Sequence, residues 1–318
     1  MGRASRRARL QIPRPSSPFA PVSPRDTLSA ILTAVVWGLT FVAIKFGVGE
    51  APPFLLTALR FAFAAVPAVF FIKPPRATPA LVILYGLLIG VGQFGLLFYA
   101  FSRGMTVGLA SVIMQMQAFF TILLAWGFMR ERPTRRQIAA TAVTFLGIFV
   151  IGAARFGGAS LWPFALTLLA AACWGAGNCV GKLAGRVDAL SFTVWSSLVA
   201  PLPMFALSLV FEHGRTLPAL LHPTVTLVVC VAVIAYGGTL LGFGLWSRLL
   251  ARHPAATVAP FALLVPVVGM VASWLIFGEK LSPVEFLGAA LIMGGLAFNV
   301  LGGRKPRPAS GSAKALAS

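Results

Sequence analysis

Residues 37–45 read WGLTFVAIK and residues 174–182 read WGAGNCVGK, so a Trp-Gly pair with a lysine eight positions after the tryptophan occurs twice, 137 positions apart. Two further matches follow in the same order: Ser102-Arg103 recurs as Ser247-Arg248, and Trp126 with Glu131 recurs as Trp274 with Glu279. Each match alone is weak, but their common order indicates that the chain consists of two related halves.

The composition places both halves in a membrane. Of 318 residues, 58% are apolar and only 10% are charged, whereas soluble domains carry about 25% charged residues. Charges, prolines and glycines separate ten apolar runs, each near the length that a bilayer-spanning helix requires. Their expected limits are 27–48, 53–72, 79–101, 107–129, 137–154, 161–182, 189–211, 224–246, 255–277 and 284–302.

The basic residues predict the orientation of these spans. If successive spans cross the membrane in alternating directions, the loops and tails on one side hold twenty Lys and Arg residues. Those on the other side hold four: Arg103, Arg155, Arg215 and Lys280. In membrane proteins the cytoplasmic loops carry the excess of Lys and Arg, so we expect both termini in the cytoplasm. We expect the lipid bilayer, and no nucleic acid, to be the partner of this basic chain. We expect a multi-pass membrane protein.

Five spans per half is an odd number, so the second half must enter the membrane in the opposite direction. We therefore predict an all-α integral membrane protein of ten transmembrane helices arranged as two inverted five-helix repeats, residues 27–155 and 161–303. A disordered basic cytoplasmic tail (1–26) and a second basic cytoplasmic tail (304–318) flank them. Inverted repeats are typical of transporters, whose substrate binds where the halves meet.

Other functional classes find little support in the residues. The sequence has no H-E-x-x-H, G-x-S-x-G or P-loop motif, and its acidic residues and histidines all fall at span ends or in loops. Cys173, Cys179 and Cys230 lie within apolar runs without metal-ligand spacing. We predict no catalytic residues, no metal and no cofactor, and transport that needs no proton gradient.

Polar residues inside the apolar runs are the candidates for a substrate site. Lys45 and Arg60 could meet a carboxylate, although snorkelling or a hydrogen bond to a backbone carbonyl would also explain them. Gln93, Gln115 and Asn178, with the rings of Trp37, Trp174 and Tyr236, could receive an ammonium group, although amides also join helices. On a regular helix Gln117 would lie about 200° from Gln115, so we expect Gln115 to face the site.

Several stretches resemble the EamA family of the drug/metabolite transporter superfamily. They are residues 37–45, the segment from Pro52-Pro53 to Arg60-Phe61, residues 108–120 (GLASVIMQMQAFF), residues 264–269 (LVPVVG) and Gly278-Glu279. The resemblance covers residues 27 to 303 and is closest to bacterial exporters of O-acetylserine and cysteine. It implies a ten-helix, multi-pass exporter of the bacterial inner membrane that works by alternating access between two EamA repeats.

The leading functional hypothesis is therefore a secondary transporter that exports small zwitterionic metabolites, such as cysteine and O-acetylserine. Two alternatives remain open: export of another metabolite, such as an aromatic amino acid or a purine, and a membrane scaffold or receptor without transport. The sequence leaves the oligomeric state undetermined.

Overall fold

The computed structural model describes residues 23–155, 161–185, 187–212 and 214–301, and these residues form helices without strands. The predicted C-terminal tail, Arg186 and residues 1–22 of the predicted N-terminal tail lie outside these ranges. Residues 24–26, which we expected to be disordered, instead begin the first helix. Ser23 caps that helix, because its hydroxyl accepts a hydrogen bond from the backbone N–H of Asp26.

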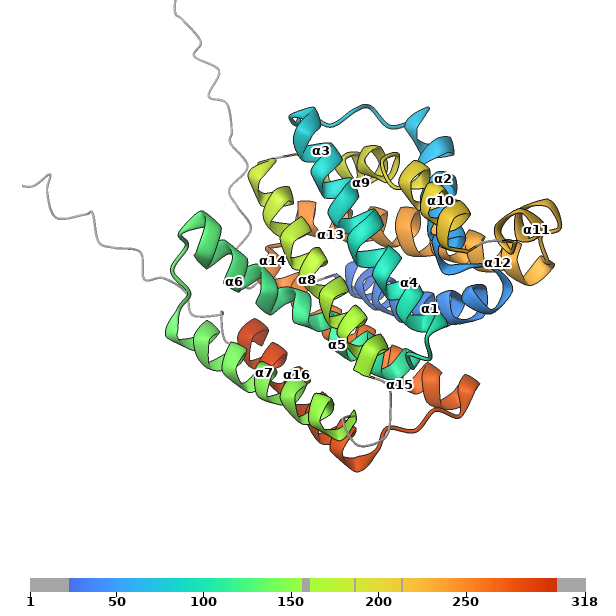
Figure 1. Ribbon diagram of the computed structural model, residues 1–318. Coiled ribbons are helices and arrows are strands. Elements are labelled where there is room, and N and C mark those ends of the chain that lie inside the picture. Colours follow the sequence, from blue (N-terminus) through green and yellow to red (C-terminus); the bar gives the residue numbers. More distant parts are fainter. Residues whose placement is uncertain (1–22, 156–160, 186, 213, 302–318) are drawn as a thin grey trace, which may run out of the picture.

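The first half of the chain forms five spans (Figure 1). Two of these spans change helix type on the way across. The elements are α1 (Pro24–Glu50), α2 (Pro53–Val69), α3 (Pro79–Gly86) with η1 (Leu87–Gly95) and α4 (Leu96–Ser102), α5 (Val107–Ile113) with η2 (Met114–Met116) and α6 (Gln117–Met129), and α7 (Arg135–Arg155).

The second half repeats this order. Its elements are α8 (Leu161–Leu183), α9 (Ala189–Ser197) with α10 (Pro201–Phe211), the short α11 (Thr216–Leu221), α12 (Val225–Ala232) with η3 (Val233–Leu241) and α13 (Gly242–Arg252), α14 (Ala255–Val258) with η4 (Ala259–Leu263) and α15 (Leu264–Phe277), and α16 (Pro283–Leu301). The short α11 lies between the predicted spans 189–211 and 224–246.

The predicted fold class is confirmed. Among the described residues, nine helical segments are long and apolar enough to cross a membrane, and the 17-residue α2 supplies the tenth span. The two five-span halves form one bundle, with α7 and α16 packed against each other at its edge (Figure 1). The chain is a multi-pass membrane protein.

The two halves also share their irregularities. Their third spans each contain nine π-helical residues, η1 and η3, and their fourth spans each contain a 3₁₀ segment, η2 and η4. The helices α6 and α15 both end at a residue in the left-handed conformation, Arg130 with φ 56° and Gly278 with φ 63°. Departures from α-helical geometry often mark functional positions, so their repetition directs attention to the third and fourth spans.

The repeated Trp-Gly pair serves contacts between the halves. A Cβ on Gly38 of α1 would lie 2.6 Å from Cβ of Val268 in α15, and one on Gly175 of α8 would lie 2.7 Å from Cβ of Phe120 in α6. Any larger residue would push these helices apart, because Cβ atoms do not approach so closely. Glycine is therefore required at both positions for the halves to pack.

Candidate functional site

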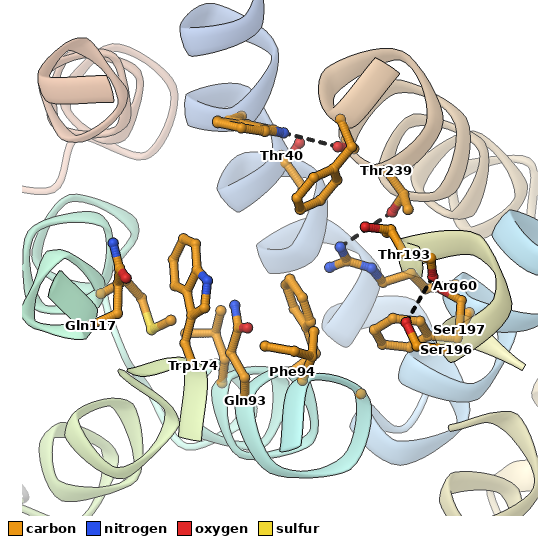
Figure 2. Close-up of a pocket in the computed structure, with 18 of the residues that line it drawn as sticks. Thr40, Arg60, Gln93, Phe94, Gln117, Trp174, Thr193, Ser196, Ser197 and Thr239 are labelled. Atoms are coloured by element: carbon orange, nitrogen blue, oxygen red, sulfur yellow. Dashed lines mark hydrogen bonds between the residues drawn. The ribbon is translucent and has the colours of Figure 1, made fainter. Parts of the chain in front are cut away.

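A cavity of about 300 Å³ lies where the two halves meet (Figure 2). Its walls come from α1, α2, the α3–η1–α4 span, η2 and α6 of the first half and from α8, α9, the span of η3 and α13, and the span of η4 and α15 in the second. Binding sites for small molecules occupy about 300 to 1,000 Å³, so this cavity suits one small metabolite. Its polar and aromatic lining residues include Trp37, Arg60, Gln93, Phe94, Gln115, Gln117, Trp174, Asn178, Thr193, Ser196, Ser197, Thr239, Phe243 and Trp246.

The described lining of the cavity reaches toward the end of the bundle where α1 and α9 begin. Thr193 and Ser196, from the first turns of α9, line it at the end where α1 and α9 begin. Toward the opposite end, tightly packed apolar side chains close the space: Leu55, Phe98, Met105 and Leu109 are each fully buried. The structure therefore shows a site that is shut from the end of the bundle where α2 begins.

Arg60 is the charged side chain in this cavity. It is 2% exposed, and its Nη2 donates a 3.3 Å hydrogen bond to Oγ1 of Thr239, whereas its Nε and Nη1 have no protein partner among the described residues. The guanidinium carbon lies 3.4 Å from the centre of the Phe94 ring, and this cation–π contact offsets part of the cost of burying the charge. An arginine stays protonated, so the cavity presents a cation with free N–H donors.

Amide side chains supply the neutral polar groups. Gln93 is 3% exposed, and its Oε1 has no protein partner among the described residues. Asn178 donates from Nδ2 to Oε1 of Gln117 at 2.6 Å and to Oγ1 of Thr121 at 3.1 Å, which links α8 to α6. Arg60 and Gln93 therefore each keep side-chain atoms without a partner among the described residues.

Aromatic rings form much of the remaining wall. The indole of Trp37 donates from Nε1 to the Gly238 carbonyl at 2.9 Å, and its ring lies 5.3 Å from the rings of both Phe243 and Trp246. The close approach of α13 to α1 depends on glycine, because a Cβ on Gly242, the first residue of α13, would lie 2.3 Å from Nε1 of Trp37. This cluster gives the site a rigid apolar face.

Six of the eight residues proposed from the sequence line the cavity: Trp37, Arg60, Gln93, Gln115, Trp174 and Asn178. The other two lie outside its lining. The ammonium of Lys45 pairs with Oε1 of Glu279 at 2.7 Å and donates to the Met105 carbonyl at 3.3 Å, while the Tyr236 ring is 43% exposed on the outside of η3. A direct contact between either of these two residues and a substrate remains a prediction that the geometry does not favour.

The sequence analysis missed several lining residues. Gln117 lines the cavity together with Gln115, so the expectation that only one faces the site is wrong. Gln115 lies within the 3₁₀ segment η2 and Gln117 follows that segment directly; a 3₁₀ helix turns about 120° per residue instead of 100°, which changes the direction of the side chains. Thr239 and Phe94 were missed because π-helical geometry cannot be read from hydropathy; the glycines in residues 86–95 and 237–242 were the available signal.

The arrangement can bind a small organic anion. Arg60 is the one charged residue among the described cavity-lining residues, and the part of the chain that the structure describes has no group of three metal-ligating side chains. A lone buried guanidinium recognises carboxylate or phosphate oxygens.

Comparisons with known proteins agree with this architecture. The model of the EamA-like transporter family matches residues 27–153 and 161–301. A Salmonella typhimurium protein called "Probable amino-acid metabolite efflux pump" is 40% identical over 295 residues, which cover 91% of this chain and 99% of the relative. An Escherichia coli protein of the same name is 39% identical over 291 residues, covering 88% and 96% of the two chains.

Two more distant proteins extend the comparison. A Streptantibioticus cattleyicolor protein called "Probable terminal-alkyne amino-acid exporter" is 29% identical over 283 residues, covering 84% of this chain and 90% of the relative. A solved structure with 19% identity superposes with a TM-score of 0.59 over 88% of this chain and 98% of the other, which shows a shared fold.

Proposed function

Because this chain belongs to the EamA-like transporter family, we propose that it is an exporter of amino acids and related small metabolites in the bacterial inner membrane. Two relatives named as amino-acid metabolite efflux pumps share about two fifths of its residues along nearly their whole length, and this supports the substrate class. Within that class, cysteine and O-acetylserine are the substrates we propose first.

The observation that carries the proposal is the lone cation in the cavity. Every amino acid has a carboxylate, and two nitrogens of Arg60 have no hydrogen-bond partner among the described residues. A buried charge that no described acidic side chain neutralises is costly in a membrane, so a substrate that neutralises it would bind where the halves meet. The amides and indole faces of the same cavity would contact the rest of the substrate.

We propose that transport follows alternating access, with both termini in the cytoplasm. In that orientation the cavity extends toward the cytoplasm, where an exporter must load its substrate. Rocking of one half against the other would then close this end and open the end now sealed by Phe98 and Met105.

A flux panel tests the function. Purified protein in lipid vesicles should take up radiolabelled cysteine, O-acetylserine or another amino acid faster than protein-free vesicles do, with saturable kinetics. Uptake limited to aromatic amino acids or purines would reassign the substrate, and an absence of flux for every solute in the panel would favour the scaffold or receptor alternative.

A further inference from the structure

We propose that the two lysine–glutamate pairs of the sequence repeat are positioning residues that act as alternating clamps. In this structure the Lys45–Glu279 pair holds the start of α5 at the closed end of the bundle. In the opposite state of the carrier, the Lys182–Glu131 pair holds the start of α14 and releases it again when the cytoplasmic end opens. The inference rests on the proposed function, because it concerns the change between the two states of a transporter.

The Lys45–Glu279 pair holds the start of α5 with both of its charges. The Lys45 ammonium donates to the Met105 carbonyl at 3.3 Å, and Oε2 of Glu279 accepts from the backbone N–H of Val107 at 2.9 Å. Val107 is the first residue of α5, so its N–H has no partner within the helix. Met105 and Val107 are fully buried, and the two charged residues come from opposite halves. Opening this end therefore requires the clamp to release α5.

The repeat places an equivalent pair at the other end of the bundle. Lys182 and Glu131 occupy the repeat positions of Lys45 and Glu279. They also come from opposite halves and form an ion pair, between the last turn of α8 and the residues that follow α6. This is the end toward which the described lining of the cavity reaches.

The two pairs differ in what else they hold. The side chains of Lys182 and Glu131 hydrogen-bond only to each other among the described residues, and they are 52% and 46% exposed. The corresponding values for Lys45 and Glu279 are 26% and 15%. Exposed ion pairs contribute little stability, so the pair at the open end is formed but holds no other part of the chain.

The repeat also identifies the partner of this second pair. The 148 positions that separate Glu131 from Glu279 also separate Val107 from Ala255, and these two residues begin α5 and α14. Each helix begins the fourth span of its half, where the first N–H groups lack partners within the helix. When the cytoplasmic end closes, Glu131 would accept from the N–H of Ala255 as Glu279 now accepts from Val107. Because both ion pairs exist in one conformation, the change of state exchanges their backbone partners.

Proline substitutions test the clamps, because proline lacks the N–H and is favoured at the first position of a helix. The reporter is Ala262→Cys, a thiol in the cavity lining of full-length protein without native cysteines. An impermeant thiol reagent added outside cells can reach it only when the outer end opens. Val107→Pro removes a hydrogen bond to a charged group, so labelling from outside should become about tenfold or more faster.

Two further variants keep this result interpretable. Glu279→Ala removes the acceptor instead of the donor and should accelerate labelling in the same way. Val225→Pro is the control, because Val225 also begins a helix at the outer end but its N–H donates to no acidic side chain among the described residues. Unchanged labelling in both Val107→Pro and Glu279→Ala, or equal acceleration by Val225→Pro, would overturn the inference.

The opposite perturbation tests the exchange itself. Ala255→Pro and Glu131→Ala should each slow labelling from outside by about tenfold, because they weaken only the state in which the cytoplasmic end is closed. Unchanged labelling in both variants would reject the second clamp. The assay needs no transported solute, so an absence of amino-acid flux would reject the proposed function and leave the labelling result readable.

Discussion

Replacing Arg60 by glutamine should abolish substrate binding without unfolding the protein. The guanidinium is 2% exposed and has one hydrogen bond, to Thr239, so it contributes little to the fold through polar contacts. Its loss removes the cation–π contact with Phe94, worth about 0.5–2 kcal/mol. It also removes buried donors without partners, which cost about 1–3 kcal/mol each. These effects oppose each other, so the melting temperature without substrate should change by only a few degrees.

The loss of binding is much larger. Truncating one partner of a buried, hydrogen-bonded charge pair costs about 2–5 kcal/mol. At 1.4 kcal/mol per factor of ten, the Kd for an amino acid should rise by about 30-fold to 4,000-fold.

The assay measures the thermal stabilisation of detergent-purified protein by an amino-acid ligand, together with flux in vesicles. Arg136→Gln is the matched control, because Arg136 also has an unpaired buried Nε and a ring contact, with Phe298, but lies outside the cavity lining. An Arg60→Gln variant that is stabilised by substrate as strongly as wild type would refute the assignment of Arg60 as the carboxylate-binding residue.

Three further predictions concern packing, energetics and topology. Gly38→Ala should destabilise the bundle by about 1–3 kcal/mol, because the added Cβ would overlap Val268. Gly49→Ala is the control and should not destabilise it, because the space around a Cβ at that position is open. Equal melting temperatures for the two variants would contradict the packing argument. Flux in vesicles should proceed down a substrate gradient without a pH gradient, because the described cavity lining has no carboxylate or histidine, and an absolute requirement for a proton gradient would contradict this. In a variant without native cysteines, Arg132→Cys should react with an impermeant thiol reagent from the cytoplasm and Leu217→Cys from outside, and labelling of both from the same side would break the inverted arrangement.

The spans could be predicted from the sequence because they are determined by hydropathy and by the charges, prolines and glycines that separate the apolar runs. The predicted run 161–182 is α8 (Leu161–Leu183), and 107–129 is the span Val107–Met129. Prolines at Pro53 and Pro79 mark helix starts in the sequence and in the structure. Membrane helices must satisfy their own backbone hydrogen bonds, so local sequence is sufficient to place them.

The site was only partly predictable, because the direction of a side chain depends on helix geometry. Gln93 and Arg60 could be found as polar residues deep within apolar runs. The cavity positions of Gln117 and Thr239 depend on the 3₁₀ and π segments, which a regular helical wheel does not represent. Lys45 was proposed for its charge, but a single sequence does not reveal that Glu279, 234 residues away, lies within 2.7 Å of it.

The central claim, that this protein carries amino acids through the cavity at Arg60, is tested most directly by counterflow. Vesicles with purified protein are loaded with an unlabelled amino acid, diluted into a trace of the same compound in radiolabelled form, and compared with vesicles containing Arg60→Gln. The account predicts a transient accumulation of label in wild-type vesicles and none in the variant. Equal accumulation in both, or none in either for any amino acid, would contradict it.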